Sequence, residues 1–174
     1  MKTLELDILE HDTDALAHNW ANILTLIERN PFSERMKFLL EHQDLFNKPV
    51  LNLAGELEPP NCHGTAFWVA GVSKLNYPYQ ANEDELNEHM KPEERGESDE
   101  SRWRVCNPHI ERRIPGAFSF SFDYNAGWHS GIYLGKIENE HIFFAQHGTH
   151  RGFGPESLRC YTNPTYYIPR SLKK

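Results

Sequence analysis

The first third of the chain carries the spacing of an amphipathic helix. Between positions 12 and 30, apolar side chains recur at the three- and four-residue intervals of one helix face. They are Leu16, Trp20, Ile23, Leu24 and Ile27. Asp12 or Thr13 can cap the start of this helix with a side-chain oxygen. Asn30 precedes a proline, which disfavours helical backbone, so the helix is expected to end there.

A second helix is predicted over positions 33–46, with Ser33 as its N-cap. The side chains that it offers for burial are Met36, Leu39, Leu40 and Phe46. We therefore interpret residues 1–48 as an N-terminal helical extension that packs on a main domain formed by residues 49–174.

A third, shorter helix is predicted within "PPNCHGTAFWVAG", which begins at Pro59. The apolar positions on one side of it are Cys62, Ala66, Val69 and Ala70. The helix is expected to start near Cys62, directly after the two prolines, and to end at Gly71. This placement puts a cysteine at a helix N-terminus.

The second half of the chain changes to the two-residue period of strands. In "IPGAFSFSFD", phenylalanines alternate with alanine and serines, as in a strand with one buried face. The segments "WHSGIYLG", "HIFFAQHG" and "TYYIP" follow as further strands. Helices followed by a run of antiparallel strands predict an α+β fold. Residues 82–102 between the two halves are polar, acidic and rich in helix breakers. They predict a short helix near residues 83–90 that continues as a surface loop or a disordered segment.

Charge and hydropathy exclude several classes of partner. The net charge is −7 and no run of lysines and arginines occurs, so binding to nucleic acid or to an anionic membrane surface is not expected. No apolar stretch approaches the ~20 residues of a membrane span. The acidic N-terminus has no apolar segment of the secretory type, so we expect a cytoplasmic protein, or one exported by a dedicated secretion system.

The three cysteines, Cys62, Cys106 and Cys160, do not form a disulfide framework or a zinc motif. Their number is odd, and no pair has the C-x-x-C spacing of structural zinc sites. Cys106 and Cys160 have no reactive context and are interpreted as structural or surface thiols. We expect neither a metal nor a cofactor.

Cys62 has the setting that a nucleophilic thiol needs. A helix N-terminus and a neighbouring imidazole both lower the pKa of a thiol, and the backbone N–H groups of the first turn can hold an oxyanion. His129 opens a predicted strand between two glycines and is the candidate base. Gln146 and His147, on opposite faces of the next strand, are alternative residues for orienting the imidazole.

These segments resemble papain-like cysteine peptidases and amidases of the NlpC and CHAP type. "NCHGTAFWVAG", "RIPGAFSFSF", "HSGIYLG" and "HIFFAQHG" occur in the order and spacing of that family, over about residues 61–158. The resemblance implies a papain-like core, in which a helix that starts at the nucleophile packs on an antiparallel sheet. It also implies Cys62 as nucleophile, His129 as base, and Gln146 in preference to His147 as the third residue. Asn61-Cys62-His63-Gly64 departs from the family's Asp-Cys-Ser-Gly.

The resemblance implies a cysteine hydrolase that cleaves an amide bond, with a peptidoglycan peptide or amide as substrate, as in a bacterial toxin or effector. Two alternatives remain, a deamidase or acyl-transfer enzyme acting on a protein, and a non-catalytic peptide-binding module on the same scaffold. A protein substrate or a cognate inhibitor is a possible partner. Asn61, His63 and Trp128 are candidates for substrate binding. A helix should turn His63 away from Cys62, so a partly exposed polar side chain is expected there.

Overall fold

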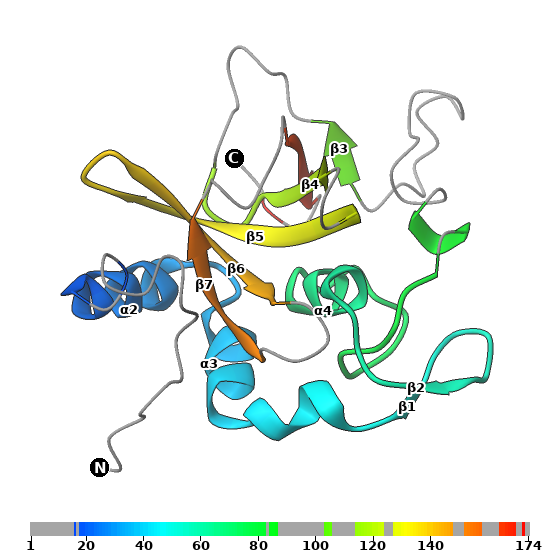
Figure 1. The fold of residues 1–174 in the computed structure, drawn as a ribbon. Helices are drawn as coiled ribbons and strands as arrows, with labels where there is room; N and C mark the ends of the chain where they lie inside the picture. The colour runs from blue at the N-terminus through cyan, green and yellow to red at the C-terminus, as the bar shows by residue number, and fades with distance from the viewer. Residues whose placement is uncertain are drawn as a thin grey trace.

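The computed structural model describes residues 16, 18–82, 84–86, 103–105, 114–123, 127–147, 152–157, 164–169 and 172. The chain folds as an α+β protein (Figure 1). The helical elements are α2 (Trp20–Arg29), α3 (Ser33–Glu41), the 3-10 helix η1 (Gln43–Asn47) and α4 (Cys62–Val69). The strands are β1 (Val50–Leu51), β2 (Leu57–Glu58), β3 (Trp103–Val105), β4 (Phe118–Asp123), β5 (Gly127–Ile137), β6 (Glu140–Gln146), β7 (Phe153–Ser157) and β8 (Thr165–Pro169).

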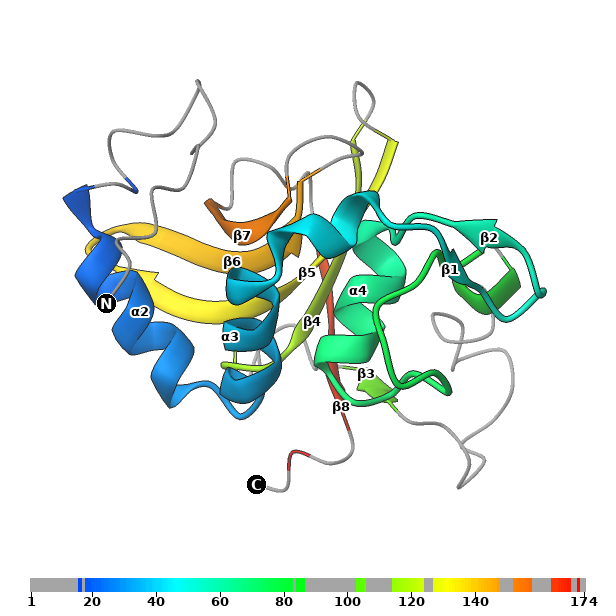
Figure 2. The same cartoon turned by 90° about the horizontal axis from the view of Figure 1, so that it is seen from below.

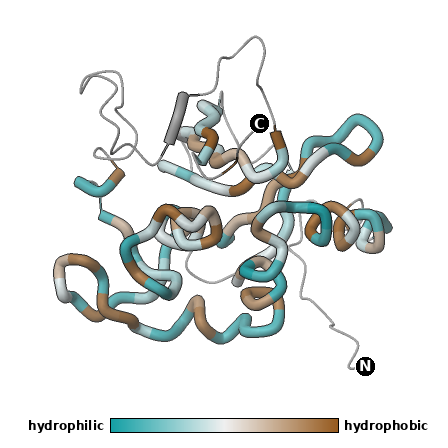
Figure 3. The backbone as a smooth tube through the Cα atoms, turned by 180° about the vertical axis from the view of Figure 1, so that it is seen from behind, coloured by the Kyte–Doolittle hydropathy of each residue, from teal (hydrophilic) through white to brown (hydrophobic). Residues whose placement is uncertain are grey.

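Six strands form one antiparallel sheet in the order β3-β8-β4-β5-β6-β7. Strands β4 to β7 are neighbours in the order of the chain, and β8 returns to lie beside β4. Strands β1 and β2 pair separately as a short hairpin. The long β5–β6 hairpin ends in a polar turn, which is seen as the hydrophilic tip in Figure 3.

Three helices lie together on one side of the central strands (Figures 1 and 2). Helix α4 packs on β5 and β6, and its Phe67 ring stacks on Phe118 of β4 at a centroid distance of 5.3 Å. Arg35 of α3 holds the end of α4, where its guanidinium donates to the Trp68 carbonyl oxygen and lies over the Trp68 ring. A cation at this end is favourable because the last carbonyl groups of a helix carry partial negative charge.

The N-terminal helices share their core with the sheet. Ile23, Ile27 and Met36 are buried in the same apolar cluster as Phe67 and Phe118. Polar contacts add to this packing. The Asn30 amide donates to the Tyr133 carbonyl oxygen of β5 at 3.2 Å. The amide of Gln43 donates to the Phe153 carbonyl oxygen and accepts from the Phe153 N–H, both at 2.8 Å.

Most of the predicted elements are present, with three corrections. Helix α3 begins at Ser33, whose hydroxyl makes no capping bond, and ends at Glu41, where η1 follows. Strand β4 is buried on both faces, because Ser119 and Ser121 are as inaccessible as Phe118. Strand β7 was not predicted, because "FGPES" contains a glycine and a proline. Pro155 is tolerated there because β7 is an edge strand, where a missing backbone N–H leaves no partner unpaired.

Some predictions concern residues outside the described part of the chain. These are the Asp12 or Thr13 cap, most of the acidic segment 82–102, and the environments of Cys106 and Cys160. Among the described residues, no helix has the length and apolar character needed to cross a bilayer.

Candidate active site

Helix α4 begins at Cys62, and its start is fixed by a polar cap. Asn61 has extended backbone, and its side-chain oxygen accepts from the Gly64 N–H at 2.9 Å. The Asn61 amide nitrogen donates to the Ala81 carbonyl oxygen at 2.7 Å, which ties the helix start to the segment after it. A side chain at position 64 would place its Cβ 2.0 Å from the Tyr79 carbonyl oxygen, so this close approach requires glycine.

The Asn61 cap leaves the first N–H groups of α4 free for another acceptor. The Asn61 side chain takes the Gly64 N–H and its carbonyl takes the Thr65 N–H, whereas helical geometry gives those of Cys62 and His63 no acceptor within the helix. Both groups belong to the first turn of α4, which carries the Cys62 side chain. They are therefore placed to bind negative charge that develops next to the sulfur.

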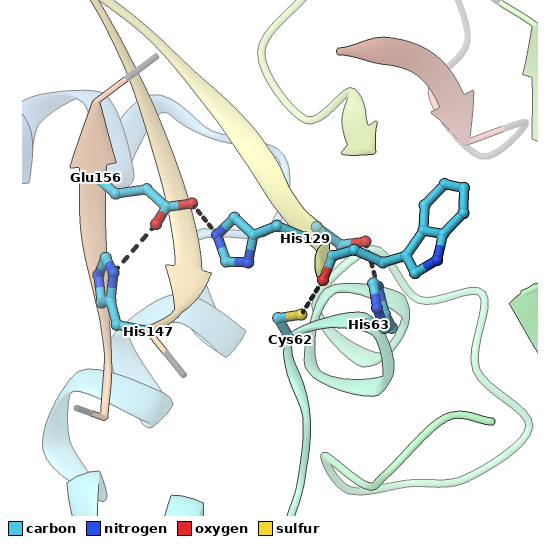
Figure 4. Close-up of polar contacts among 7 residues, drawn as sticks. Cys62, His63, His129, His147 and Glu156 are labelled. Carbon is cyan, nitrogen blue, oxygen red and sulfur yellow. Dashed lines mark hydrogen bonds and ion pairs between the residues drawn. The ribbon is translucent and has the colours of Figure 1, made fainter. Parts of the chain in front are cut away.

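The partly exposed Cys62 sulfur lies between two imidazole rings, those of His129 and His63 (Figure 4). It is 3.9 Å from the Trp128 carbonyl oxygen, which can accept the thiol proton in the neutral state. Burial opposes ionisation of this thiol. Hydrogen bonds and positive charge from His129 and His63 outweigh the burial and lower the pKa of Cys62 to about 6. The thiolate is therefore the main form at neutral pH.

His129 is held by Glu156, a residue of β7. The Nε2 atom of His129 lies 2.8 Å from Oε1 of Glu156, and the two side chains are 16% and 4% exposed. Nδ1 is thus the ring nitrogen left for Cys62. Burial disfavours the charged ring, but the Glu156 carboxylate and the Cys62 sulfur raise the pKa of His129 to about 11. The pair is therefore a thiolate and an imidazolium near neutral pH.

The second oxygen of Glu156 is occupied by His147. Nδ1 of His147 lies 3.1 Å from Oε2, so each carboxylate oxygen faces one imidazole (Figure 4). Burial of Glu156 favours the neutral acid. The charges and hydrogen bonds of His129 and His147 overcome this and hold the pKa of Glu156 far below its usual range. Glu156 is thus a buried anion whose two oxygens are both hydrogen-bonded.

The register of the sheet brings these three side chains together. Gly131, Ala145 and Gly154 pair with one another across β5, β6 and β7. His129, His147 and Glu156 are each two residues from this row and therefore share its face of the sheet. His129 and His147 lie on one side of the row and Glu156 on the other. Small residues in the row leave room for the Glu156 side chain to cross it.

The structure corrects the expected third residue. Glu156, and neither Gln146 nor His147, forms the hydrogen bond to His129 Nε2. Gln146 lies on the opposite face of β6, where its oxygen accepts from the Thr65 hydroxyl at 2.8 Å and its nitrogen donates to the Pro60 carbonyl oxygen at 2.6 Å. Gln146 thus fixes the start of α4 on the sheet. His147 reaches His129 only through Glu156.

The expected substrate-binding residues have three different settings. Both polar atoms of the Asn61 side chain are used within the protein, the oxygen in capping α4 and the nitrogen in the bond to the Ala81 carbonyl oxygen. His63 is 7% exposed and bonds Ser130, so the expectation of a partly exposed side chain turned away from Cys62 is wrong. Trp128 is 54% exposed, its carbonyl oxygen lies 3.9 Å from the Cys62 sulfur, and one face of its ring stacks on Phe120 at 4.8 Å.

The described residues contain no cluster of three or more histidine, cysteine or acidic side chains arranged for a metal ion. The arrangement of Cys62, His129 and Glu156 can perform nucleophilic chemistry without one. Comparisons of the chain with protein-family models, with curated proteins and with solved structures find no match.

Proposed function

We propose that the protein is a cysteine hydrolase with a papain-like core and that it cleaves an amide bond. One observation carries this proposal: the Cys62 thiol lies at the N-terminus of α4 beside His129, whose Nε2 is held by buried Glu156. Nucleophile, base and orienting group follow one another in the order that thiol catalysis requires. The packing of α4 on β5 and β6 supports the papain-like assignment.

In the first half of the proposed reaction, the Cys62 thiolate attacks the substrate carbonyl carbon. The new S–C bond moves an electron pair onto the carbonyl oxygen, which the Cys62 and His63 backbone N–H groups stabilise. The C–N bond then breaks. His129 gives its Nδ1 proton to the leaving amine, and a thioester on Cys62 remains. Glu156 keeps the ring oriented and stabilises its charged form.

In the second half, water attacks the thioester carbonyl carbon. Neutral His129 accepts a proton from this water at Nδ1, and the C–S bond breaks to release a carboxylic acid and the Cys62 thiolate. The thiolate and the imidazolium are restored together, so no cofactor is consumed. The role of Glu156 is the same in both halves, because the ring must return to one orientation.

A peptidoglycan peptide or amide is the substrate class that we propose, on the basis of the family resemblance of the sequence. Trp128 supports a substrate of this kind, because its backbone contacts Cys62 and its exposed aromatic ring can pack on a peptide or sugar group. A non-catalytic binding module would not require a thiol pKa lowered to about 6. That value therefore favours an enzyme.

Purified cell-wall peptides provide the test. Wild-type protein should convert a crosslinked or amidated peptide into products heavier in sum by one water, seen by mass spectrometry. Cys62→Ala should leave the peptide intact. A thioester trapped on Cys62 during turnover would identify the attacked carbonyl. If wild-type protein leaves a broad panel of wall peptides unchanged while Cys62 is quickly alkylated, the substrate class is wrong and the nucleophile assignment stands.

Alkylation tests the nucleophile without any substrate. Iodoacetamide at about pH 6 should modify Cys62 much faster than Cys106 or Cys160, because only a thiol with a lowered pKa is ionised there. The other two cysteines are reference thiols within the same chain. Equal rates at all three would refute the activation of Cys62.

A further inference from the structure

A second histidine contacts the nucleophile, and the proposed reaction has so far given its side chain no task. His63 directly follows Cys62 in α4, and its ring lies on the other side of the sulfur from His129 (Figure 4). The ring is 7% exposed. Burial of an imidazole is unfavourable unless its nitrogens are hydrogen-bonded, so the partners of this ring show what holds it.

Ser130 fixes the orientation of the His63 ring. Nδ1 of His63 lies 2.6 Å from the Ser130 hydroxyl oxygen, and Ser130 is fully buried. This contact leaves Nε2 as the ring nitrogen that can donate to the Cys62 sulfur, whether Nδ1 accepts from the hydroxyl or donates to it. The Phe120 ring lies 5.8 Å from the ring centroid and limits its rotation. His63 is thus a fixed ring against the sulfur.

The two rings at the sulfur differ in the group that hydrogen-bonds their other ring nitrogen. His129 is hydrogen-bonded to the Glu156 carboxylate, which also binds His147. This negative charge keeps the proton on the His129 ring until the leaving amine takes it. His63 is backed by a neutral hydroxyl. In the described part of the chain, the titratable groups placed around Cys62 are His63 of α4, His129 of β5, Glu156 of β7, and His147, which directly follows β6. The environment therefore assigns proton transfer to His129 and a fixed hydrogen bond to His63.

We propose that His63 is a further catalytic residue, which donates a hydrogen bond to the Cys62 thiolate and so increases the fraction of the nucleophile that is ionised. The importance of His63 for turnover rests on the proposed function. The effect of His63 on the Cys62 thiol is independent of that function, because ionisation of Cys62 is measured without a substrate. The lowered pKa of Cys62, to which His63 contributes by hydrogen bond and charge, supports the assignment.

This role has a signature that a purely structural role lacks. A donor that stabilises the thiolate increases its amount at low pH but reduces the reactivity of each thiolate. For each unit by which loss of the donor raises the thiol pKa, alkylation should become about threefold slower near pH 5 and about threefold faster near pH 9. Damage to the site would slow the reaction at both pH values.

The experiment measures the alkylation rate of Cys62 by iodoacetamide across pH, with the modified peptide quantified by mass spectrometry. His63→Phe keeps a ring beside Phe120 and removes the donor, and Ser130→Ala removes only the hydroxyl that orients it. We expect an apparent thiol pKa about one unit higher in His63→Phe, a smaller rise in Ser130→Ala, and crossing rate profiles in both. His18→Ala, which removes an exposed histidine from the N-terminal region, should match wild type.

Two results would overturn the proposal. One is a thiol pKa in both variants that equals the wild-type value. The other is a uniform loss of the alkylation rate at all pH values in Ser130→Ala. Ser130→Ala is the smaller change, so it is expected to fold even if His63→Phe does not. Either result leaves the proposed hydrolase intact, because fast alkylation of wild-type Cys62 tests that function separately. Loss of alkylation in His129→Ala with no change in His63→Phe would place the whole effect on His129.

Discussion

Replacing Glu156 by glutamine should separate the charge of the orienting group from its shape. The amide can still accept the Nε2 proton of His129, at the 2.8 Å position that the carboxylate oxygen now holds. The substitution removes the negative charge that favours the protonated ring. It therefore moves the equilibrium from thiolate and imidazolium toward neutral thiol and imidazole.

The size of the effect follows from the pKa of His129. Its rise from 6.5 to about 11 corresponds to about 6 kcal/mol. Glu156 and Cys62 both contribute to the rise, by charge and by hydrogen bond, while burial opposes it. If Glu156 accounts for about half, the variant loses about 3 kcal/mol of stabilisation of the protonated ring, a factor of about 10² in that equilibrium, and kcat/KM should fall mainly at alkaline pH. The alkaline limb of the pH profile should move down by about two pH units.

The assay is kcat/KM across pH on a purified wall peptide, with thermal melting as a check on folding. Glu41→Gln is the matched control, because it removes one carboxylate from the exposed end of α3. We expect wild-type kinetics in the control. The reasoning fails if Glu156→Gln folds normally, keeps kcat/KM within about threefold of wild type and retains its alkaline limb.

Four further predictions concern the same site. Cys62→Ala and His129→Ala should each lower kcat by about 10⁴-fold or more with the fold intact, and the double variant should be no worse than either. Activity should rise with pH through about 6 as the Cys62 thiolate forms, and fall near 11 as His129 loses its proton, in a pH–rate profile. Trp128→Ala should raise KM by about tenfold with kcat little changed, whereas Trp128→Phe keeps the stacking face. Gln43→Ala loses two hydrogen bonds to Phe153 and should lower the melting temperature by about 2–8 °C in calorimetry.

The proposed nucleophile Cys62 and the histidine beside it could be selected from sequence because each is tied to a local pattern. Cys62 follows two prolines and opens an apolar run, and His129 opens an alternating strand, so helix and strand periods alone place both at the ends of elements. The same local reasoning found α2, α3, α4 and strands β4, β5, β6 and β8. The α+β class follows from their order.

Glu156 could not be selected in this way. The strand that carries it is "FGPES", in which glycine and proline hide the strand period. Its contact with His129 depends on the pairing of Ala145 with Gly131 and Gly154. A register that involves three strands cannot be predicted from the sequence of any single segment. The sequence offers no comparable signal, because Glu156 lies among glycine, proline and serine. The orientation of His63, a candidate for substrate binding, was wrongly predicted for a related reason, since helix spacing does not show that its ring turns back toward Ser130.

Strand β7 links the N-terminal helices to the chemistry of the site. As an edge strand, β7 pairs with β6 alone, so its other backbone groups need a partner elsewhere. Gln43 supplies one at Phe153, where its amide takes both the N–H and the carbonyl group, three residues before Glu156. The neighbouring Gly152 has a φ of +74°, and a Cβ there would lie 2.3 Å from the Gln43 side-chain oxygen. The segment before Cys62 thus completes the support of the residue that orients His129.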